Sequence, residues 1–167
     1  MGNKYSFQDF NKETMAKAYG SNLQISFKKS VEVSRRIRGK KLSYVISYLE
    51  KVVDKKIPVP YIRFNAEVPH RKGKGISSGG YPVNVSKAFI KLLNSAKKNA
   101  SEQEISGELY VLGVSANKGT KRYRPGRFSG RLMKSTNVEV IIGLKIKNEN
   151  LEVVKKWLKE KFWVINF

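Results

Sequence analysis

One stretch, from Lys118 to Lys134, limits what this chain can fold into more than any other part of it. It holds seven Lys or Arg in seventeen residues and no carboxylate, and the segments on both sides of it are typical of strands. Such charges repel one another on a projecting loop unless an anionic partner neutralises them. Its glycines and its proline favour a turn, and Tyr123 and Phe128 offer flat faces on which bases stack. We interpret the stretch as the tip of a β-hairpin that enters folded RNA; the alternative is a solvated, disordered loop.

The two flanking segments predict the arms of that hairpin. Residues 109–116 are β-like, residues 138–146 are rich in β-branched residues, and apolar residues recur at every second position of the later segment. Joined by the basic loop, the segments predict an antiparallel hairpin over 109–146. A further strand is predicted at Leu23 to Ile25, where apolar and polar residues alternate.

Helical periodicity occurs in three other segments. The first spans 26–39 with a serine N-cap and a glycine C-cap, the second begins near Ser43 and ends before Pro58, and the third spans 84–101. The sequence therefore predicts an α+β fold, with a three-stranded antiparallel sheet packed against about three helices. A long protruding β-hairpin and a C-terminal helical extension complete the predicted architecture.

Composition divides the chain into three regions. Residues 1–22 are polar and without a period, which predicts an N-terminal arm. Residues 23–147 form the predicted globular domain, which includes the hairpin and an insertion loop at 57–82. Residues 148–167 predict an amphipathic helical extension whose end, FWVINF, is too apolar to stay in water.

Two segments of the globular domain concentrate positive charge and hold few acids. The insertion loop holds four prolines and four glycines, and no acid occurs between Glu67 and Glu102. A loop of this length inside a compact domain is usually functional or ordered by a partner, and RNA suits a basic one. The first predicted helix is also basic outside its apolar stripe, and Glu32 alone interrupts that basic face.

The charge of the whole chain narrows the class of partner. There are 34 Lys plus Arg against 13 Asp plus Glu, a net charge of +21, while 40% hydrophobic residues favour a folded globule. This balance points to nucleic acid first and to an anionic membrane surface second. No run of eighteen apolar residues occurs and the start MGNKYSFQDF lacks a signal-peptide core, so we expect a cytoplasmic location and no membrane partner.

The sequence offers little for catalysis. It has no cysteine, and its single histidine, His70, lies in a loop rich in Gly and Lys without a second ligand nearby. The glycines of KGKGISSGG fit neither a Walker loop nor the GxGxxG pattern. We therefore predict no enzymatic activity, no catalytic residues, no cofactor and no metal site.

Several short segments together resemble a known family. They are IRGKK at 37–41, VPYIRFN at 59–65, YPVNVSKAFIKLLNSAKKNA at 81–100, RFSGR at 127–131 and TNVEVII at 136–142. In this order and spacing they resemble the large-subunit ribosomal protein twenty-two family, in its archaeal and eukaryotic branch. The resemblance covers residues 23–142, most of the chain.

The resemblance implies a structural protein of the large ribosomal subunit without enzymatic activity. Such a protein binds large-subunit rRNA, supports subunit assembly and lines the nascent-peptide exit tunnel with its basic hairpin. Its implied partners are large-subunit rRNA, neighbouring large-subunit ribosomal proteins and the nascent polypeptide, and its location is the cytoplasmic ribosome. The alternative from charge alone is a non-ribosomal RNA-binding or DNA-binding module.

The candidate binding residues are the cations and aromatic residues of the basic helix faces, the insertion loop and the hairpin. For rRNA they are Lys28, Lys29, Arg35, Arg36, Arg38, Lys40, Lys41, Arg63, Arg71, Lys72, Lys74, Lys87, Lys91, Lys118, Lys121, Arg122, Tyr123, Arg124, Arg127, Phe128, Arg131 and Lys134. By the resemblance, the tunnel-lining tip would be Arg124, Pro125, Gly126, Arg127, Phe128, Ser129, Gly130 and Arg131.

Overall fold

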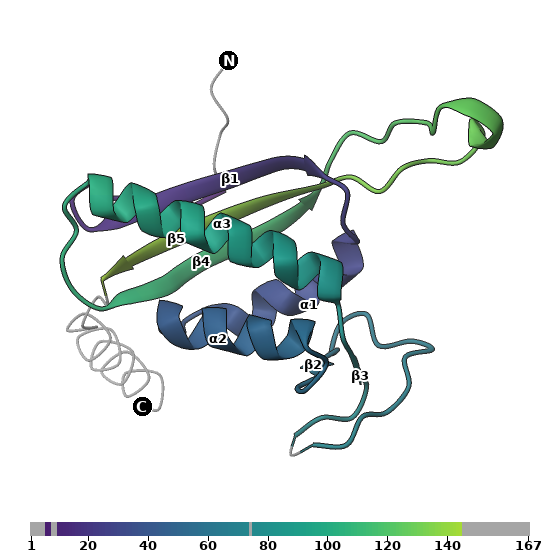
Figure 1. The fold of residues 1–167 in the computed structure, drawn as a ribbon, viewed down its shortest axis with the longest axis horizontal. Helices are drawn as coiled ribbons and strands as arrows, with labels where there is room; N and C mark the ends of the chain where they lie inside the picture. Colours follow the sequence, from purple (N-terminus) through teal and green to yellow (C-terminus); the bar gives the residue numbers. More distant parts are fainter. Residues whose placement is uncertain (1–5, 8–9, 74, 145–167) are drawn as a thin grey trace, which may run out of the picture.

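The computed structural model describes residues 6–7, 10–73 and 75–144, apart from the side chain of Phe128. Within them a three-stranded antiparallel sheet carries three helices on one face, which is the predicted α+β fold (Figure 1). The strands of this sheet are β1 (Met15–Leu23), β4 (Leu109–Lys118) and β5 (Thr136–Leu144). The helices are α1 (Phe27–Ile37), α2 (Leu42–Val53) and α3 (Val83–Glu102). The smaller elements are β2 (Val59–Pro60), β3 (Gly79–Gly80) and the 3₁₀ helix η1 (Gly126–Phe128).

Strand β5 lies at the centre of the sheet, between β1 and β4. Both neighbours run antiparallel to it, so that Ala18 of β1 and Val114 of β4 lie on either side of Val140. Val140 is 0% exposed and Ile141, which points to the other face, is 2% exposed. The central strand thus buries both of its faces and anchors the two edge strands.

The strand predicted at Leu23 to Ile25 was placed wrongly, because β1 occupies Met15–Leu23. Eight residues that were predicted to belong to the N-terminal arm therefore form an edge strand. Small residues alternate along β1 and carry little hydrophobic signal, but they let α3 approach closely. A Cβ on Gly20 would lie 3.1 Å from Cδ2 of Leu92 on α3.

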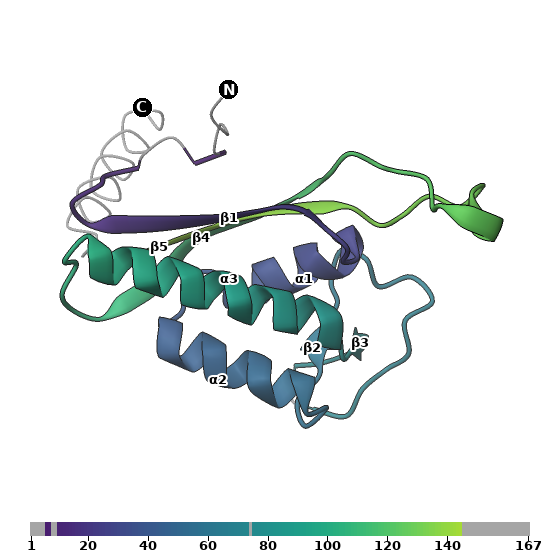
Figure 2. The ribbon, with the colours of Figure 1, turned by 45° about the horizontal axis from the view of Figure 1, so that its top comes forward.

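The helices form two tiers beneath the sheet. Figure 2 shows α1 and α3 against the strands and α2 farther away; α3 packs on β1 and β5, α1 on β4, and α2 on α3. The apolar stripe predicted for the third helix is confirmed, since Phe89, Leu93 and Ala96 are fully buried. Burying such side chains supplies most of the stability of an amphipathic helix.

The turn between α1 and α2 is joined to the sheet through its backbone. Gly39 has a φ of +75°, a conformation that favours glycine, and follows directly on the C-cap of α1. Its N–H donates to the carbonyl of Val111 at 2.7 Å, and the N–H of Val111 donates to the carbonyl of Lys40 at 2.9 Å. The predicted glycine cap therefore also fixes the basic end of α1 against β4.

The predicted long protruding β-hairpin is not confirmed as a continuous ladder. Pairing of β4 with β5 ends at Lys118 opposite Thr136, and the residues beyond form an irregular loop with one isolated bridge between Tyr123 and Leu132. We call residues 119–135 the projecting loop, because they extend away from the sheet (Figure 2). The predicted helical extension at 148–167 lies outside the described residues.

Candidate nucleic-acid interface

The predicted rRNA-binding residues lie on the surface wherever the structure describes them. All of these side chains are exposed except Lys40, which is half-buried; Lys74 and the side chain of Phe128 lie outside the described part. Ion pairs join Lys41 with Glu108 at 2.9 Å and Lys56 with Asp54 at 3.2 Å. The exposed cations among the described residues are thus accessible to an anionic partner.

The projecting loop brings several of the predicted tip residues together. The N–H of Arg124 donates to the carbonyl of Arg131 at 2.9 Å, and the N–H of Met133 donates to that of Arg122 at 2.7 Å. Gly126, with a φ of +79°, starts the 3₁₀ turn at the end of the loop. Tyr123 is 68% exposed. The loop therefore exposes arginines and an aromatic ring, and hydrogen bonds within the loop hold its backbone.

Side-chain hydrogen bonds hold the root of the projecting loop. Oδ1 of Asn137 accepts the N–H of Asn22 at 2.8 Å, and the hydroxyl of Ser135 donates to Oδ1 of Asn22 at 3.0 Å. The buried hydroxyl of Thr136 donates to the carbonyl of Ile25 at 2.9 Å. Sequence reasoning missed this network, because its members lie more than a hundred residues apart.

Helix α1 and the turn after it carry a second group of predicted cations, and some of them also have structural roles. Nη2 of Arg38 donates to the carbonyl of Val114 at 2.6 Å, so this guanidinium ties α1 to β4. The guanidinium of Arg36 lies 5.8 Å from the ring centroid of Tyr48, and Nζ of Lys40 lies 5.3 Å from that of Tyr44. Burial, together with the charge of Arg36, lowers the pKa of Lys40. A phosphate bound there would oppose that shift.

A buried carboxylate holds the insertion loop. In the sequence, this residue stands out only because it interrupts the basic face of the first predicted helix. Glu32 of α1 is 1% exposed. Its Oε1 accepts the N–H groups of Arg63 at 2.9 Å and Phe64 at 2.8 Å, and its Oε2 accepts that of Ile62 at 3.0 Å. Three amides thus compensate the buried charge. This single side chain therefore ties residues 62–64 of the loop to α1.

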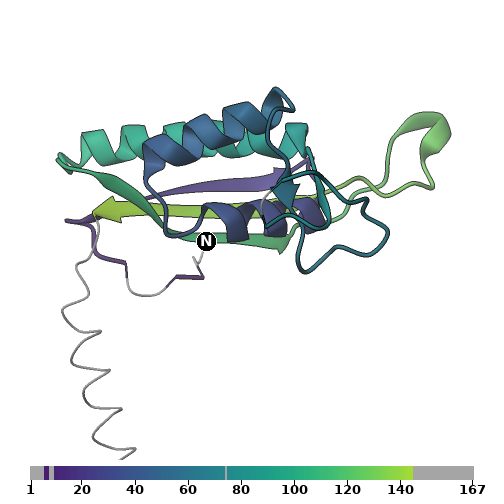
Figure 3. The same ribbon diagram turned by 90° about the horizontal axis from the view of Figure 1, so that it is seen from below.

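The two basic loops leave the molecule at the same end. Figure 3 shows the projecting loop and the insertion loop extending beyond the same end of the sheet. Within the insertion loop, Arg71 lies over the ring of Tyr81, 5.5 Å from its centroid, and Lys72 is exposed. Lys87 and Lys91 of α3 are also exposed. The predicted site residues therefore form several basic areas, and the two loops bring the densest of them to one end.

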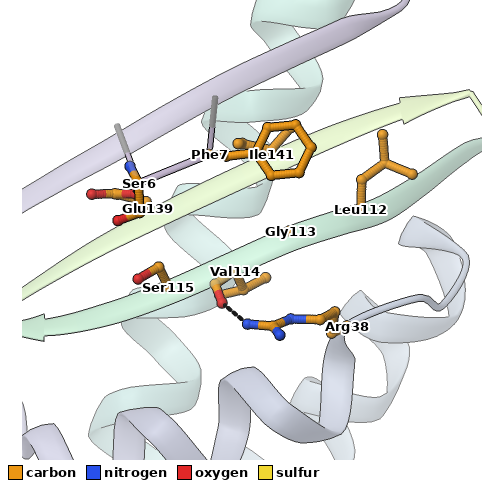
Figure 4. Close-up of a pocket in the computed structure, with 9 residues that line it drawn as sticks. All are labelled: Ser6, Phe7, Arg38, Leu112, Gly113, Val114, Ser115, Glu139 and Ile141. Carbon is orange, nitrogen blue, oxygen red and sulfur yellow. Dashed lines mark hydrogen bonds between the residues drawn. The ribbon is translucent and has the colours of Figure 1, made fainter. Parts of the chain in front are cut away.

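A hollow on the sheet face away from the helices has a different character. Its lining includes Phe7, Leu112 and Ile141, with the carboxylate of Glu139 accepting the N–H of Ser6 at 2.9 Å (Figure 4). Its one cationic lining residue is Arg38, which is bonded to a backbone carbonyl. An apolar hollow with an acid does not suit a polyanion.

The described residues hold no group of three or more His, Cys, Asp or Glu that could bind a metal ion. His70 pairs through its backbone with Ser78 in an isolated bridge within the insertion loop. Over the same residues, none of the helices has the length and apolarity needed to cross a membrane.

Comparison with known proteins shows that the sequence is similar to those of ribosomal proteins. The sequence model of the family described as Ribosomal protein L22p/L17e matches residues 18–143. Large ribosomal subunit protein uL22 of Methanococcus vannielii is 39% identical over 134 residues, which cover 76% of this chain and 88% of the relative. The same protein of Methanosphaera stadtmanae is 39% identical over 148 residues, covering 84% and 96%. That of Nanoarchaeum equitans is 36% identical over 159 residues, covering 89% and 88%.

Proposed function

Because the chain belongs to the ribosomal protein L22p/L17e family, we propose that it is a structural constituent of the large ribosomal subunit that binds large-subunit rRNA. The observation that carries this proposal is the arrangement of the two basic loops at one end of the fold (Figure 1). Their exposed cations would neutralise phosphates of more than one RNA segment, which suits a protein that helps a large RNA to fold during subunit assembly.

The projecting loop would line the nascent-peptide exit tunnel. It extends beyond the sheet and carries Arg124, Arg127 and Arg131 at its end. Arginine bridges phosphates in a fork geometry and stacks on bases, so the loop would be embedded in rRNA on one side and face the nascent polypeptide on the other. In this role the protein has no enzymatic activity, no cofactor and no metal.

The remaining partners would be neighbouring large-subunit proteins within the cytoplasmic ribosome. Residues 148–167 carry the apolar end FWVINF, and we place its docking partner among those proteins. Deleting 148–167 is expected to reduce crosslinking to neighbouring proteins while the chain stays in the subunit. Unchanged neighbour crosslinks after the deletion would contradict this part of the proposal.

Sedimentation of native cell extract on a sucrose gradient tests the main proposal. Stoichiometric migration with the large subunit, retained as salt is raised, is expected for an integral component. A free binder with several phosphate contacts would lose roughly 10³ to 10⁵ in affinity between 50 and 200 mM salt. Migration at the top of the gradient would instead favour the alternative, a non-ribosomal RNA-binding or DNA-binding module.

A further inference from the structure

Two aromatic rings meet where three distant segments of the chain come together. Phe27 begins α1 and Phe64 belongs to the insertion loop; their ring centroids lie 6.2 Å apart at an interplanar angle of 64°. Lys118, the last residue of β4, places its Nζ 5.6 Å from the centroid of Phe27. Both rings are half-buried, so part of each is open to solvent.

Two further cations complete this group, which we call the aromatic cluster: Phe27, Lys28, Arg63, Phe64 and Lys118. Nζ of Lys28 lies 5.8 Å from the centroid of Phe64, and Cζ of Arg63 lies 5.4 Å from it. All three cations are exposed. The ring faces attract them, but three like charges around two touching rings still repel one another.

The buried acid Glu32 positions part of the aromatic cluster through backbone amides. Both oxygens of Glu32 are directed at the backbone amides of residues 62–64. This carboxylate therefore sets the position of Arg63 and Phe64 while their side chains stay at the surface. The adjacent Ile62 is 62% exposed, so the same tight turn also presents an apolar side chain to solvent.

We propose that the aromatic cluster is a site for one unpaired RNA nucleotide, an inference that rests on the rRNA binding proposed above. A paired helix presents phosphates and sugars to a protein and keeps its bases stacked inside. The exposed parts of the two rings would be accessible only to a base that has left the stack. Lys28 and Lys118 would neutralise the phosphates on either side of that base.

A base could stack on the rings once the lysines move away from the ring faces. The lysines sit on flexible stems and can swing from the ring faces to phosphates. Arg63 already lies over Phe64, and bases stack on guanidinium planes as well as on aromatic rings. A nucleotide held here would contact α1, the insertion loop and the root of the projecting loop, so it would fix both basic loops relative to the sheet.

The test uses the full chain and two RNA probes, a stem-loop with a single-uridine bulge and the same stem without the bulge. The wild type is expected to bind the bulged probe more tightly. Phe64→Leu keeps an apolar side chain but removes the ring, and it should weaken binding of the bulged probe by roughly five- to a hundredfold. Binding of the paired probe should stay unchanged, because no cation is lost.

Two further variants separate stacking from charge. Phe64→Trp should restore the preference for the bulge. Lys118→Gln should lower the salt slope of binding by about one for both probes. Phe10→Leu is the matched control, because the ring of Phe10 also lies under a lysine, with Nζ of Lys17 4.6 Å from its centroid, but outside the aromatic cluster. It should leave the preference intact.

Equal binding of the bulged probe by Phe64→Leu and wild type, or no preference in the wild type, would overturn the inference. So would equal competition by a polyglutamate peptide, which would indicate a protein partner. If Phe64→Leu does not fold, Phe27→Leu removes the other ring and decides the question. Absence of a bulge preference in the wild type, with intact subunit association, refutes this inference alone, whereas failure of the wild type to sediment with the large subunit refutes the proposed function.

Discussion

The insertion loop and the projecting loop are both basic and rich in glycine, yet the protein holds them in different ways. In the insertion loop, Glu32 ties three successive amides to α1, and the N–H of Tyr61 donates to the carbonyl of Ser78 at 2.9 Å. Beyond its root, the backbone hydrogen bonds of the projecting loop join residues of the loop to one another, and nearly all of its residues are exposed. One loop is thus positioned before any partner binds. The other, in the proposed function, would be held in place by RNA.

Glu32→Ala should produce the largest loss of stability, because it leaves three amides beneath the insertion loop without their acceptor. We expect the free energy of unfolding to fall by about 2–4 kcal/mol, measured by urea denaturation. Glu32→Gln, which keeps one carbonyl acceptor, should lose less. A loss under about 0.5 kcal/mol for Glu32→Ala would show that the insertion loop is no better anchored than the projecting loop.

Gly119→Ala tests the root of the projecting loop. A Cβ there would meet Oγ of Ser135 and come within 2.8 Å of Oδ1 of Asn22, two atoms that belong to the same hydrogen-bond network. We expect a loss of about 1–2 kcal/mol in the free energy of unfolding. Gly130→Ala, in the same loop, is the control, because a Cβ there meets nothing within 4 Å. Equal effects of the two variants would mean that the root is not fixed.

Ionisation of Tyr61 at alkaline pH should destabilise the protein around the insertion loop. Burial, with the charge of Glu32 as a smaller cause, raises the pKa of Tyr61 above its usual 10.0. The folded protein therefore holds this proton more tightly than the unfolded chain does. The resulting stability is fully present below pH 10.0 and is lost as pH rises through the folded-state pKa.

Urea denaturation of the wild type and Tyr61→Phe at neutral pH and above pH 10.0 measures this effect. The wild type should lose more stability with rising pH than the variant. Lysines titrate in both proteins and cancel from the comparison. Parallel loss in the two proteins would show that the ring of Tyr61 is not buried in solution.

Arg124→Gln with Arg127→Gln should change stability least. Both side chains are exposed at the end of the projecting loop, so the free energy of unfolding should stay within about 0.5 kcal/mol of the wild type. Their effect should appear in RNA binding, where the salt slope should fall by roughly one to two. A clear loss of stability would show that the projecting loop is ordered by its own side chains and would remove the contrast with the insertion loop.

Local signals in the sequence predicted much of this protein correctly. Helices α1 and α3 and strands β4 and β5 lie close to their predicted positions, because each carries its own period or cap. The family was also predicted from short segments of the chain. The exposure of the predicted cations followed from charge, since a lysine or arginine is rarely buried unless it is paired.

The tertiary structure decided what depends on residues far apart. Strand β1 has small residues and no strong hydrophobic pattern. It forms a strand because it pairs with β5, more than a hundred positions later in the chain. Glu32 is indistinguishable by sequence from a solvated glutamate, and only the path of the insertion loop brings three amides to it. The aromatic cluster likewise joins residues 27, 64 and 118. Periodicity and charge are local properties of a chain, whereas a buried acceptor or a shared surface exists only after the chain has folded.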